Sequence, residues 1–254
     1  MKITLRSLII ATLLAVSTLT MSAHKVIAHR GHWKMEGAAQ NSRESLQNAL
    51  DLQIYGSETD IWLTADGHLM VNHDPTFKGV NIQQATYKEC KALVLDNGEH
   101  MPQLKDFLKM LKKSKSPTKL IIEIKSHATL ERNREAARKT LQEVMKYGMA
   151  DRVEYISFNM DVCKELIRLD SHAKVAYLRG NVSPEELHKL RFTGLDYHYS
   201  AFRQHPEWIR QAHELGLTVN AWTVDEPATI QEMSEAGVDF ITTNNPIEAM
   251  QGAQ

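Results

Sequence analysis

Short apolar segments rich in β-branched residues alternate with amphipathic segments along most of the chain. The first kind is typical of buried strands, and the second of helices that cover a sheet. The pattern predicts strands at Lys25–Ala28, Gly56–Leu63, Lys119–Ile124, Val153–Ser157, Lys174–Leu178, Gly194–Tyr197, Thr218–Ala221 and Phe240–Thr242. It predicts helices at Ser42–Leu52, Leu104–Leu111, Glu131–Tyr147, Met160–Leu169, Ser183–Leu190, Pro206–Leu215, Pro227–Ala236 and Pro246–Met250.

The order of these units predicts the fold class. Eight strand–helix units in about 230 residues match the usual length of a (β/α)8 TIM barrel. A doubly wound open sheet is the alternative, but no glycine-rich phosphate loop follows the first strand. Residues 66–101 interrupt the rhythm, with Gly67–Asn72 resembling the return strand of a hairpin. We therefore expect an α/β TIM barrel with a small insertion after the second strand, covering the mouth of the barrel.

The first residues have the pattern of a secretory signal. Lys2 and Arg6 precede an apolar stretch at residues 7–19, and small residues end at Ala23. The apolar stretch is too short for a membrane span. We expect a signal peptide at residues 1–23, a mature domain at 24–254, and export to the periplasm or the medium without a stable membrane anchor. An uncleaved N-terminal anchor is the alternative.

Charge and cysteine content limit the functional classes. The formal net charge is −1 and no basic stripe is present, which argues against nucleic-acid binding. An oxidising compartment would permit a disulfide between Cys90 and Cys163. Their spacing fits neither a metal knuckle nor a redox pair, so we expect two unpaired structural cysteines and leave pairing open.

Charged clusters lie at or just after the ends of the first three strands. They are Ala28-His29-Arg30-Gly31, Glu58-Thr59-Asp60 with His73-Asp74 after it, and Glu123-Ile124-Lys125. Strand ends in a barrel meet at one mouth, and Glu58 and Asp60, two residues apart, point to the same face. We expect these clusters to form one site, joined by Trp222 from a later strand.

This set of groups is suited to cleaving a phosphate ester, which needs a cation, a base and an acid. Carboxylate ligands from Glu58, Asp60 and Glu123 favour one hard divalent cation, Mg²⁺ or Ca²⁺, over zinc. His29 and His73 are free for proton transfer.

Two cations from the same clusters, Arg30 and Lys125, can hold phosphate oxygens, Arg as a fork and Lys as a point charge. Each cluster alone has a plain structural explanation, such as a surface turn or a cross-strand ion pair. Taken together, in this order and at the ends of strands, the clusters indicate phosphodiester chemistry.

The conjunction resembles the glycerophosphodiester phosphodiesterase family from Val26 to Pro246. The motifs that carry the resemblance are Ala28-His29-Arg30-Gly31, Gln40-Asn41-Ser42, Glu58-Thr59-Asp60-Ile61, Leu63-Thr64-Ala65-Asp66-Gly67, Val71-Asn72-His73-Asp74, Met101-Pro102-Gln103-Leu104, Ile122-Glu123-Ile124-Lys125, Ala221-Trp222-Thr223-Val224-Asp225 and Gly237-Val238-Asp239-Phe240-Ile241-Thr242-Thr243-Asn244.

The resemblance implies a TIM barrel with an insertion after its second strand. It implies metal-dependent hydrolysis of small glycerophosphodiesters, a reaction of lipid metabolism that releases glycerol 3-phosphate and an alcohol. The implied residues are Glu58, Asp60 and Glu123 as metal ligands, His29 and His73 as the acid–base pair, Arg30 and Lys125 on the phosphate, and Trp222 against the glycerol moiety. The glycerol 2-hydroxyl would attack phosphorus, and water would open the resulting cyclic phosphate.

Two positions depart from the family pattern. Gln40 and Asn244 stand where the family usually has acidic residues, and both changes remove negative charge near the mouth. These two changes leave substrate preference open. The sequence also leaves open which histidine is the acid and which the base, the oligomeric state, and a barrel-core role for Trp222. One alternative function is a phospholipase D-like cleavage of lysophospholipids or sphingolipids through a cyclic phosphate. The other is a non-catalytic exported barrel that binds phosphoesters.

Overall fold

The computed structural model describes residues 24–252, and the predicted signal segment lies outside them. Eight parallel strands close into a barrel, because β1 pairs with both β2 and β11. The strands are β1 (Lys25–Ala28), β2 (Gly56–Leu63), β6 (Lys119–Ile124), β7 (Val153–Ser157), β8 (Val175–Tyr177), β9 (Gly194–His198), β10 (Thr218–Trp222) and β11 (Phe240–Thr243). The predicted TIM barrel is therefore confirmed.

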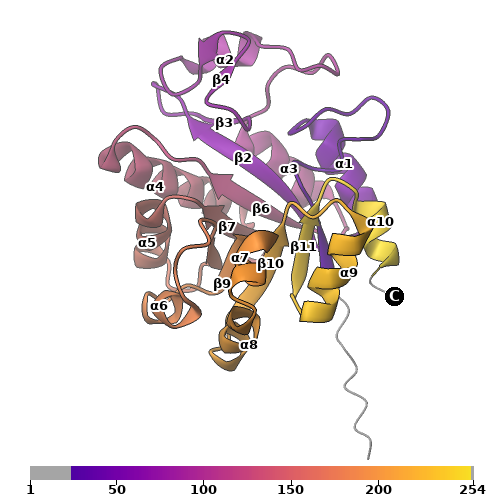
Figure 1. Cartoon of the computed structure of the whole chain (residues 1–254). Coiled ribbons are helices and arrows are strands. Elements are labelled where there is room, and N and C mark those ends of the chain that lie inside the picture. The colour runs from indigo at the N-terminus through magenta and orange to yellow at the C-terminus, as the bar shows by residue number, and fades with distance from the viewer. Residues whose placement is uncertain (1–23, 253–254) are drawn as a thin grey trace, which may run out of the picture.

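Helices surround this barrel (Figure 1). They are α1 (Arg43–Asp51), α3 (Leu104–Lys113), α4 (Leu130–Tyr147), α5 (Met160–Leu169), α6 (Pro184–Lys189), α7 (Tyr199–Gln204), α8 (Glu207–Glu214), α9 (Pro227–Ala236) and α10 (Pro246–Gln251). Each predicted helix is present within two residues of its expected ends. The sequence pattern missed α7, because six residues are too short to establish a helical period.

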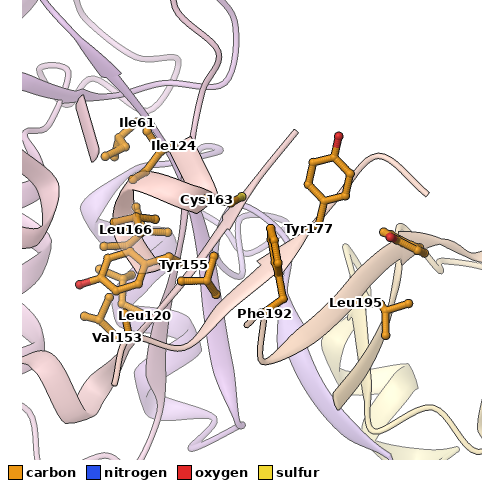
Figure 2. Packing of buried hydrophobic residues seen from close by; sticks show 14 of the residues in the cluster. Ile61, Leu120, Ile124, Val153, Tyr155, Cys163, Leu166, Tyr177, Phe192 and Leu195 are labelled. Atoms are coloured by element: carbon orange, nitrogen blue, oxygen red, sulfur yellow. The ribbon is translucent and has the colours of Figure 1, made fainter. Parts of the chain in front are cut away.

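Strand alternation divides each strand between two cores. On β6, Leu120, Ile122 and Ile124 point outward into the large core beneath the helices, whereas Ile121 belongs to a smaller core inside the barrel. Figure 2 shows part of the outer core, where Leu166 of α5 lies near Leu120, Val153 and Tyr155. Burial of these side chains holds the helical layer on the barrel.

The same alternation turns the polar residues of the strand ends into the barrel. Outward-facing neighbours flank the polar residues, as Ala28 precedes His29 and Ile124 lies between Glu123 and Lys125. The inner core beneath them is made by Ile27, Ile121, Ile156, Leu178 and Phe240. The polar residues at the carboxyl ends of the strands therefore lie directly above this apolar inner core.

The insertion projects from the carboxyl end of β2 (Figure 1, top). Its first strand, β3 (Leu69–Val71), pairs antiparallel with β2, as the hairpin prediction required. It continues through β4 (Thr76–Phe77), β5 (Val80–Asn81) and α2 (Tyr87–Ala92), a helix that was not predicted. It has its own small core, formed by Trp62, Met70, Ile82, Ala85, Cys90 and Met101. Among the residues of this segment, His73 alone lines the small pocket at the barrel mouth, so the insertion flanks the mouth on one side and does not cover it as expected.

Cys90 and Cys163 are both free and buried, in the insertion core and the outer barrel core respectively. The prediction of unpaired structural cysteines is thus confirmed. Within residues 24–252, the structure has no helix of the length and apolarity that crossing a membrane requires.

Candidate active site

Three carboxylates meet at the barrel mouth. Glu58, Asp60 and Glu123 each offer an oxygen, and these oxygens lie within 4.8 Å of one another. All three residues are buried. The pairing of β2 with β6 sets Asp60 directly beside Glu123. Three carboxylates at this spacing repel one another unless positive charge lies between them.

Lys125 supplies part of that charge. Its ammonium lies 2.7 Å from Asp60 Oδ1 and 2.8 Å from Glu123 Oε1. Burial alone would raise the pKa of Asp60, but the Lys125 ammonium, His73 and the hydrogen bond from Asn41 together lower that pKa to about 2. Burial and the Asp60 charge raise the pKa of Glu123 to about 8, with Lys125 acting in the opposite direction. Burial, Asp60 and Glu123 also raise the pKa of Glu58 well above its usual range. One lysine is therefore too little charge for three carboxylates.

The first βα loop brings a backbone donor to Glu58. The Arg30 amide donates to Glu58 Oε2 at 2.7 Å, from a left-handed conformation with φ of 57°. Gly31 follows at φ of 77°, and a Cβ there would lie 2.4 Å from Ser45 Oγ. Only glycine can follow Arg30 while α1 packs this closely.

Asn41 orients Asp60 from the same loop. Its amide nitrogen donates to Asp60 Oδ2 at 2.8 Å, and its amide oxygen accepts from Thr59 Oγ1 at 2.8 Å. The Arg30 guanidinium donates to Gln40 Oε1 at 2.6 Å. Gln40 is thus a hydrogen-bond partner of the phosphate-binding candidate.

His29 is held by a neutral amide. Asn244 donates its Nδ2 to Asp225 Oδ2 at 2.7 Å, so its Oδ1 faces His29 Nδ1 at 2.9 Å as an acceptor. His29 therefore carries its proton on Nδ1, and Nε2 is left with a lone pair. Burial and the nearby Arg30 charge lower the pKa of His29 to about 4.

His73 is held by a carboxylate. Its Nδ1 lies 2.7 Å from Asp74 Oδ1. Burial and Lys125 lower the pKa of His73, while the hydrogen bond to Asp74 raises it. The two histidines thus differ in the charge of the partner: the Asn244 amide is neutral, whereas the Asp74 carboxylate carries a negative charge and stabilises an imidazolium more strongly.

These groups share one small pocket of about 140 Å³. Its polar side includes His29, Arg30, Glu58, His73 and Glu123. The opposing lining is mostly apolar and comprises Ile156, Phe158, Leu178, Asp196, Trp222, Thr223 and Thr242. The Trp222 indole donates to the Asp196 carbonyl at 2.9 Å and meets the Phe158 ring edge-on, with centroids 5.5 Å apart. Trp222 is therefore half-buried pocket wall.

A second, more open hollow of about 780 Å³ adjoins the first and shares Arg30 and His73 with it. It lies between the first βα loop, including Trp33 and Met35, and the insertion, including Phe77. Arg30 and His73 thus stand between a small pocket and a wide groove.

The structure brings together all eight candidate site residues named from the sequence. Sequence reasoning gave no role to the residues that orient them, Asn41, Asp74 and Asp225, nor to Asp196 inside the barrel. Asp196 had a signal: it lies between Leu195 and Tyr197, whose apolar side chains alternate with it along β9. Asn41, Asp74 and Asp225 lie in loops, whose conformation follows no periodic sequence pattern.

The residues present fit a divalent cation. Glu58 Oε1 is buried and has no hydrogen-bond partner among the described residues. The donor set is purely carboxylate, which suits Mg²⁺ or Ca²⁺. A cation here would supply the charge that Lys125 alone does not.

The chain matches known proteins over nearly its whole length. The model of the glycerophosphoryl diester phosphodiesterase family matches residues 29–248. A glycerophosphodiester phosphodiesterase of Caldanaerobacter subterraneus subsp. tengcongensis is 30% identical over 235 residues, which cover 87% of this chain and 94% of that protein.

Solved structures of proteins with related names also resemble this chain. A glycerophosphodiester phosphodiesterase from Parabacteroides distasonis is 52% identical with a TM-score of 0.90, covering 91% of this chain and 97% of that one. An Oleispira antarctica phosphodiesterase, solved with the product sn-glycerol-3-phosphate, shares the fold at 22% identity and a TM-score of 0.78, covering 90% and 96%.

Proposed function

Because the chain belongs to the glycerophosphoryl diester phosphodiesterase family, we propose that its barrel mouth hydrolyses glycerophosphodiesters to glycerol 3-phosphate and an alcohol. The observation that carries this is the barrel mouth, where a buried triad of carboxylates lies beside a pocket lined by two histidines and an arginine. The product bound to the Oleispira antarctica relative supports the glycerol specificity.

Glu58, Asp60 and Glu123 would hold one divalent cation, Mg²⁺ or Ca²⁺. When bound, that cation supplies charge stabilisation to the phosphoryl oxygens. Arg30 and Lys125 add positive charge on the same side, and Asn41 keeps the Asp60 carboxylate in position. These groups bind and orient the phosphate.

His29 acts as the base in this proposal. Its neutral form dominates at neutral pH, and its lone pair is on Nε2 because Nδ1 donates to Asn244. The Nε2 atom takes the proton of the glycerol 2-hydroxyl as that oxygen bonds to phosphorus. The product of this step is the cyclic phosphate implied by the family resemblance.

His73 acts as the acid. The Asp74 carboxylate stabilises its imidazolium, so His73 holds a proton more readily than His29 does. It gives that proton to the alcohol oxygen as the bond from this oxygen to phosphorus breaks. Water then opens the cyclic phosphate with the two roles reversed.

The two hollows would bind different parts of the substrate. The 140 Å³ pocket beside Trp222 would take the glycerol moiety, and the open 780 Å³ groove the leaving alcohol. A pocket of this small volume suits a deacylated glycerol unit. This favours glycerophosphodiesters over lysophospholipids as substrates, and the complete catalytic set argues against a role in binding alone.

We further propose that residues 1–23 are a signal peptide, that residues 24–254 form the mature domain, and that the enzyme works in the periplasm or the medium. The charged and apolar pattern of residues 1–23 supports this.

The test of the function is release of glycerol 3-phosphate from glycerophosphocholine by the protein with Mg²⁺, with Ca²⁺ and with EDTA. We expect metal-dependent release that His29→Ala abolishes. Metal binding without any release would direct attention to lysolipid substrates, and folded protein that binds neither metal would contradict the proposal.

A further inference from the structure

Asp196 is one of the residues that line the catalytic pocket, and its carboxyl group has no task in the mechanism above. It points into the barrel from β9 and is 3% exposed. It also lines a separate cavity of about 350 Å³ at the amino-terminal ends of the strands. Asp196 is therefore part of the partition between that lower cavity and the catalytic pocket.

This carboxyl group lacks the partners that a buried charge needs. Its Oδ1 has no hydrogen-bond partner among the described residues. Its neighbour on β10, Asn220, donates Nδ2 to Thr242 Oγ1 at 2.8 Å. Burial raises the pKa of Asp196 to about 7, and the Asn220 amide beside it acts in the opposite direction. The buried Oδ1 is free to accept a hydrogen bond from a group that enters the pocket.

The surroundings of Asp196 in the catalytic pocket suggest which donor this is. The neighbouring walls, Ile156, Phe158, Leu178 and the Trp222 ring, offer apolar surface. Trp222 is fixed directly against Asp196, because its indole donates to the Asp196 carbonyl. A hydroxyl group that enters this part of the pocket loses water and needs an acceptor.

We propose that Asp196 is a specificity-determining residue that accepts a hydrogen bond from the terminal hydroxyl of the substrate's glycerol moiety. The inference rests on the proposed function, in which the other two glycerol oxygens already have roles. One is esterified to phosphorus, and the 2-hydroxyl gives its proton to His29. The terminal hydroxyl is left for the far side of the pocket. A site built to hydrogen-bond a hydroxyl discriminates strongly against the analogue that lacks it.

The experiment compares glycerophosphocholine with the phosphocholine ester of 1,2-propanediol, which keeps the 2-hydroxyl and lacks the terminal one. We expect the wild type to prefer the glycerol ester by roughly 10- to 100-fold in kcat/KM, the effect of one charge-assisted hydrogen bond. Asp196→Leu should bring this ratio close to one, chiefly by weakening kcat/KM for the glycerol ester. Asp196→Asn, which keeps an acceptor, should retain part of the preference.

Glu154→Gln is the matched control. Like Asp196→Asn, it changes a carboxylate to an amide inside the barrel. Glu154, however, lines the lower cavity and does not line the catalytic pocket. The Glu154→Gln variant should prefer the glycerol ester over the propanediol ester to the same extent as the wild type. A folded Asp196→Leu protein that keeps the wild-type preference would overturn the inference, as would a wild type without any preference.

Binding of products separates this inference from the proposed function. Calorimetry on the metal-loaded protein should show tighter binding of glycerol 3-phosphate than of 1,2-propanediol 1-phosphate, and Asp196→Leu should remove the difference. That result in a protein without turnover would contradict the proposed hydrolysis and support the role of Asp196. Equal affinities in the wild type would overturn the role of Asp196, whatever the turnover.

Discussion

His29 and Asn244 form a histidine–amide pair, with Nδ1 and Oδ1 2.9 Å apart, at the carboxyl ends of the first and last strands of the barrel. The amide fixes the imidazole tautomer without adding negative charge. Across the pocket His73 has a carboxylate, Asp74, in the corresponding position. This difference in partner is the physical basis for assigning the base to His29 and the acid to His73.

Asp74→Asn should move the alkaline limb of the kcat profile to lower pH. A general acid must be protonated, so the rate falls as pH rises through its pKa. The hydrogen bond to Asp74 raises the pKa of His73, and its loss lowers that pKa. A drop of one unit corresponds to about a 10-fold loss of rate at alkaline pH. A shift of the acidic limb in its place would identify His73 as the base.

Glu58→Gln should weaken metal binding. The change removes one carboxylate of the triad, and we expect at least a roughly 10-fold loss of affinity for Mg²⁺ or Ca²⁺, measured by calorimetry. EDTA should abolish wild-type activity. Glu165→Gln is the control, because Glu165 is a buried carboxylate on α5 that pairs with Arg168. Equal affinities in Glu58→Gln and wild type would refute the metal site.

Gly31→Ala should damage both stability and activity, whereas Gly37→Ala should affect stability alone. Both glycines have a positive φ, 77° and 78°, so each alanine pays about 1 kcal/mol in backbone strain. A Cβ at Gly31 would also collide with the Ser45 side chain, whereas at Gly37 it meets no atom of the described residues within 4 Å. Thermal unfolding and kcat/KM measure the two effects. Equal behaviour of the variants would argue against close packing of the first loop on α1.

His127 should make the fold less stable at acidic pH. Its Nε2 accepts from the Leu63 amide at 2.9 Å, so it must be neutral, and burial lowers its pKa to about 4. The unfolded chain binds a proton near pH ~6.5, so stability falls as pH drops below that value. Between pH 7 and 5 the loss from this group is ~2 kcal/mol.

Urea unfolding of the wild type and of His127→Gln at both pH values measures this contribution. The variant should show the smaller dependence on pH, since glutamine does not titrate. The same pH dependence in both proteins would mean that His127 accepts a proton in the folded state.

The fold was predictable because strand and helix periods are local. Seven of the eight barrel strands begin at the predicted residue, and β8 begins one residue later, at Val175. The inward direction of Glu58 and Asp60 followed from the same period of two. The short helices α2 and α7 escaped prediction because neither is long enough to repeat an apolar face.

The partners of the site residues were less predictable. Asn244 is more than two hundred residues from His29 in sequence, and closure of the barrel brings them together. Gln40 was expected to be able to form a hydrogen bond, but its partner, the Arg30 guanidinium, could not be named from the sequence. Such contacts depend on loop conformations with positive φ, as at Arg30 and Asn41, which no periodic pattern encodes.

The most direct test of the account varies the leaving group. The 4-nitrophenyl ester of glycerol phosphate releases an anion that needs no proton, whereas glycerophosphocholine releases a basic alkoxide that does. We predict that His73→Ala loses roughly 10²- to 10⁴-fold on glycerophosphocholine and recovers most of that loss on the nitrophenyl ester, while His29→Ala stays inactive on both. Recovery by His29→Ala in place of His73→Ala would contradict the assignment, and a metal-loaded wild type inactive on both esters would contradict the function.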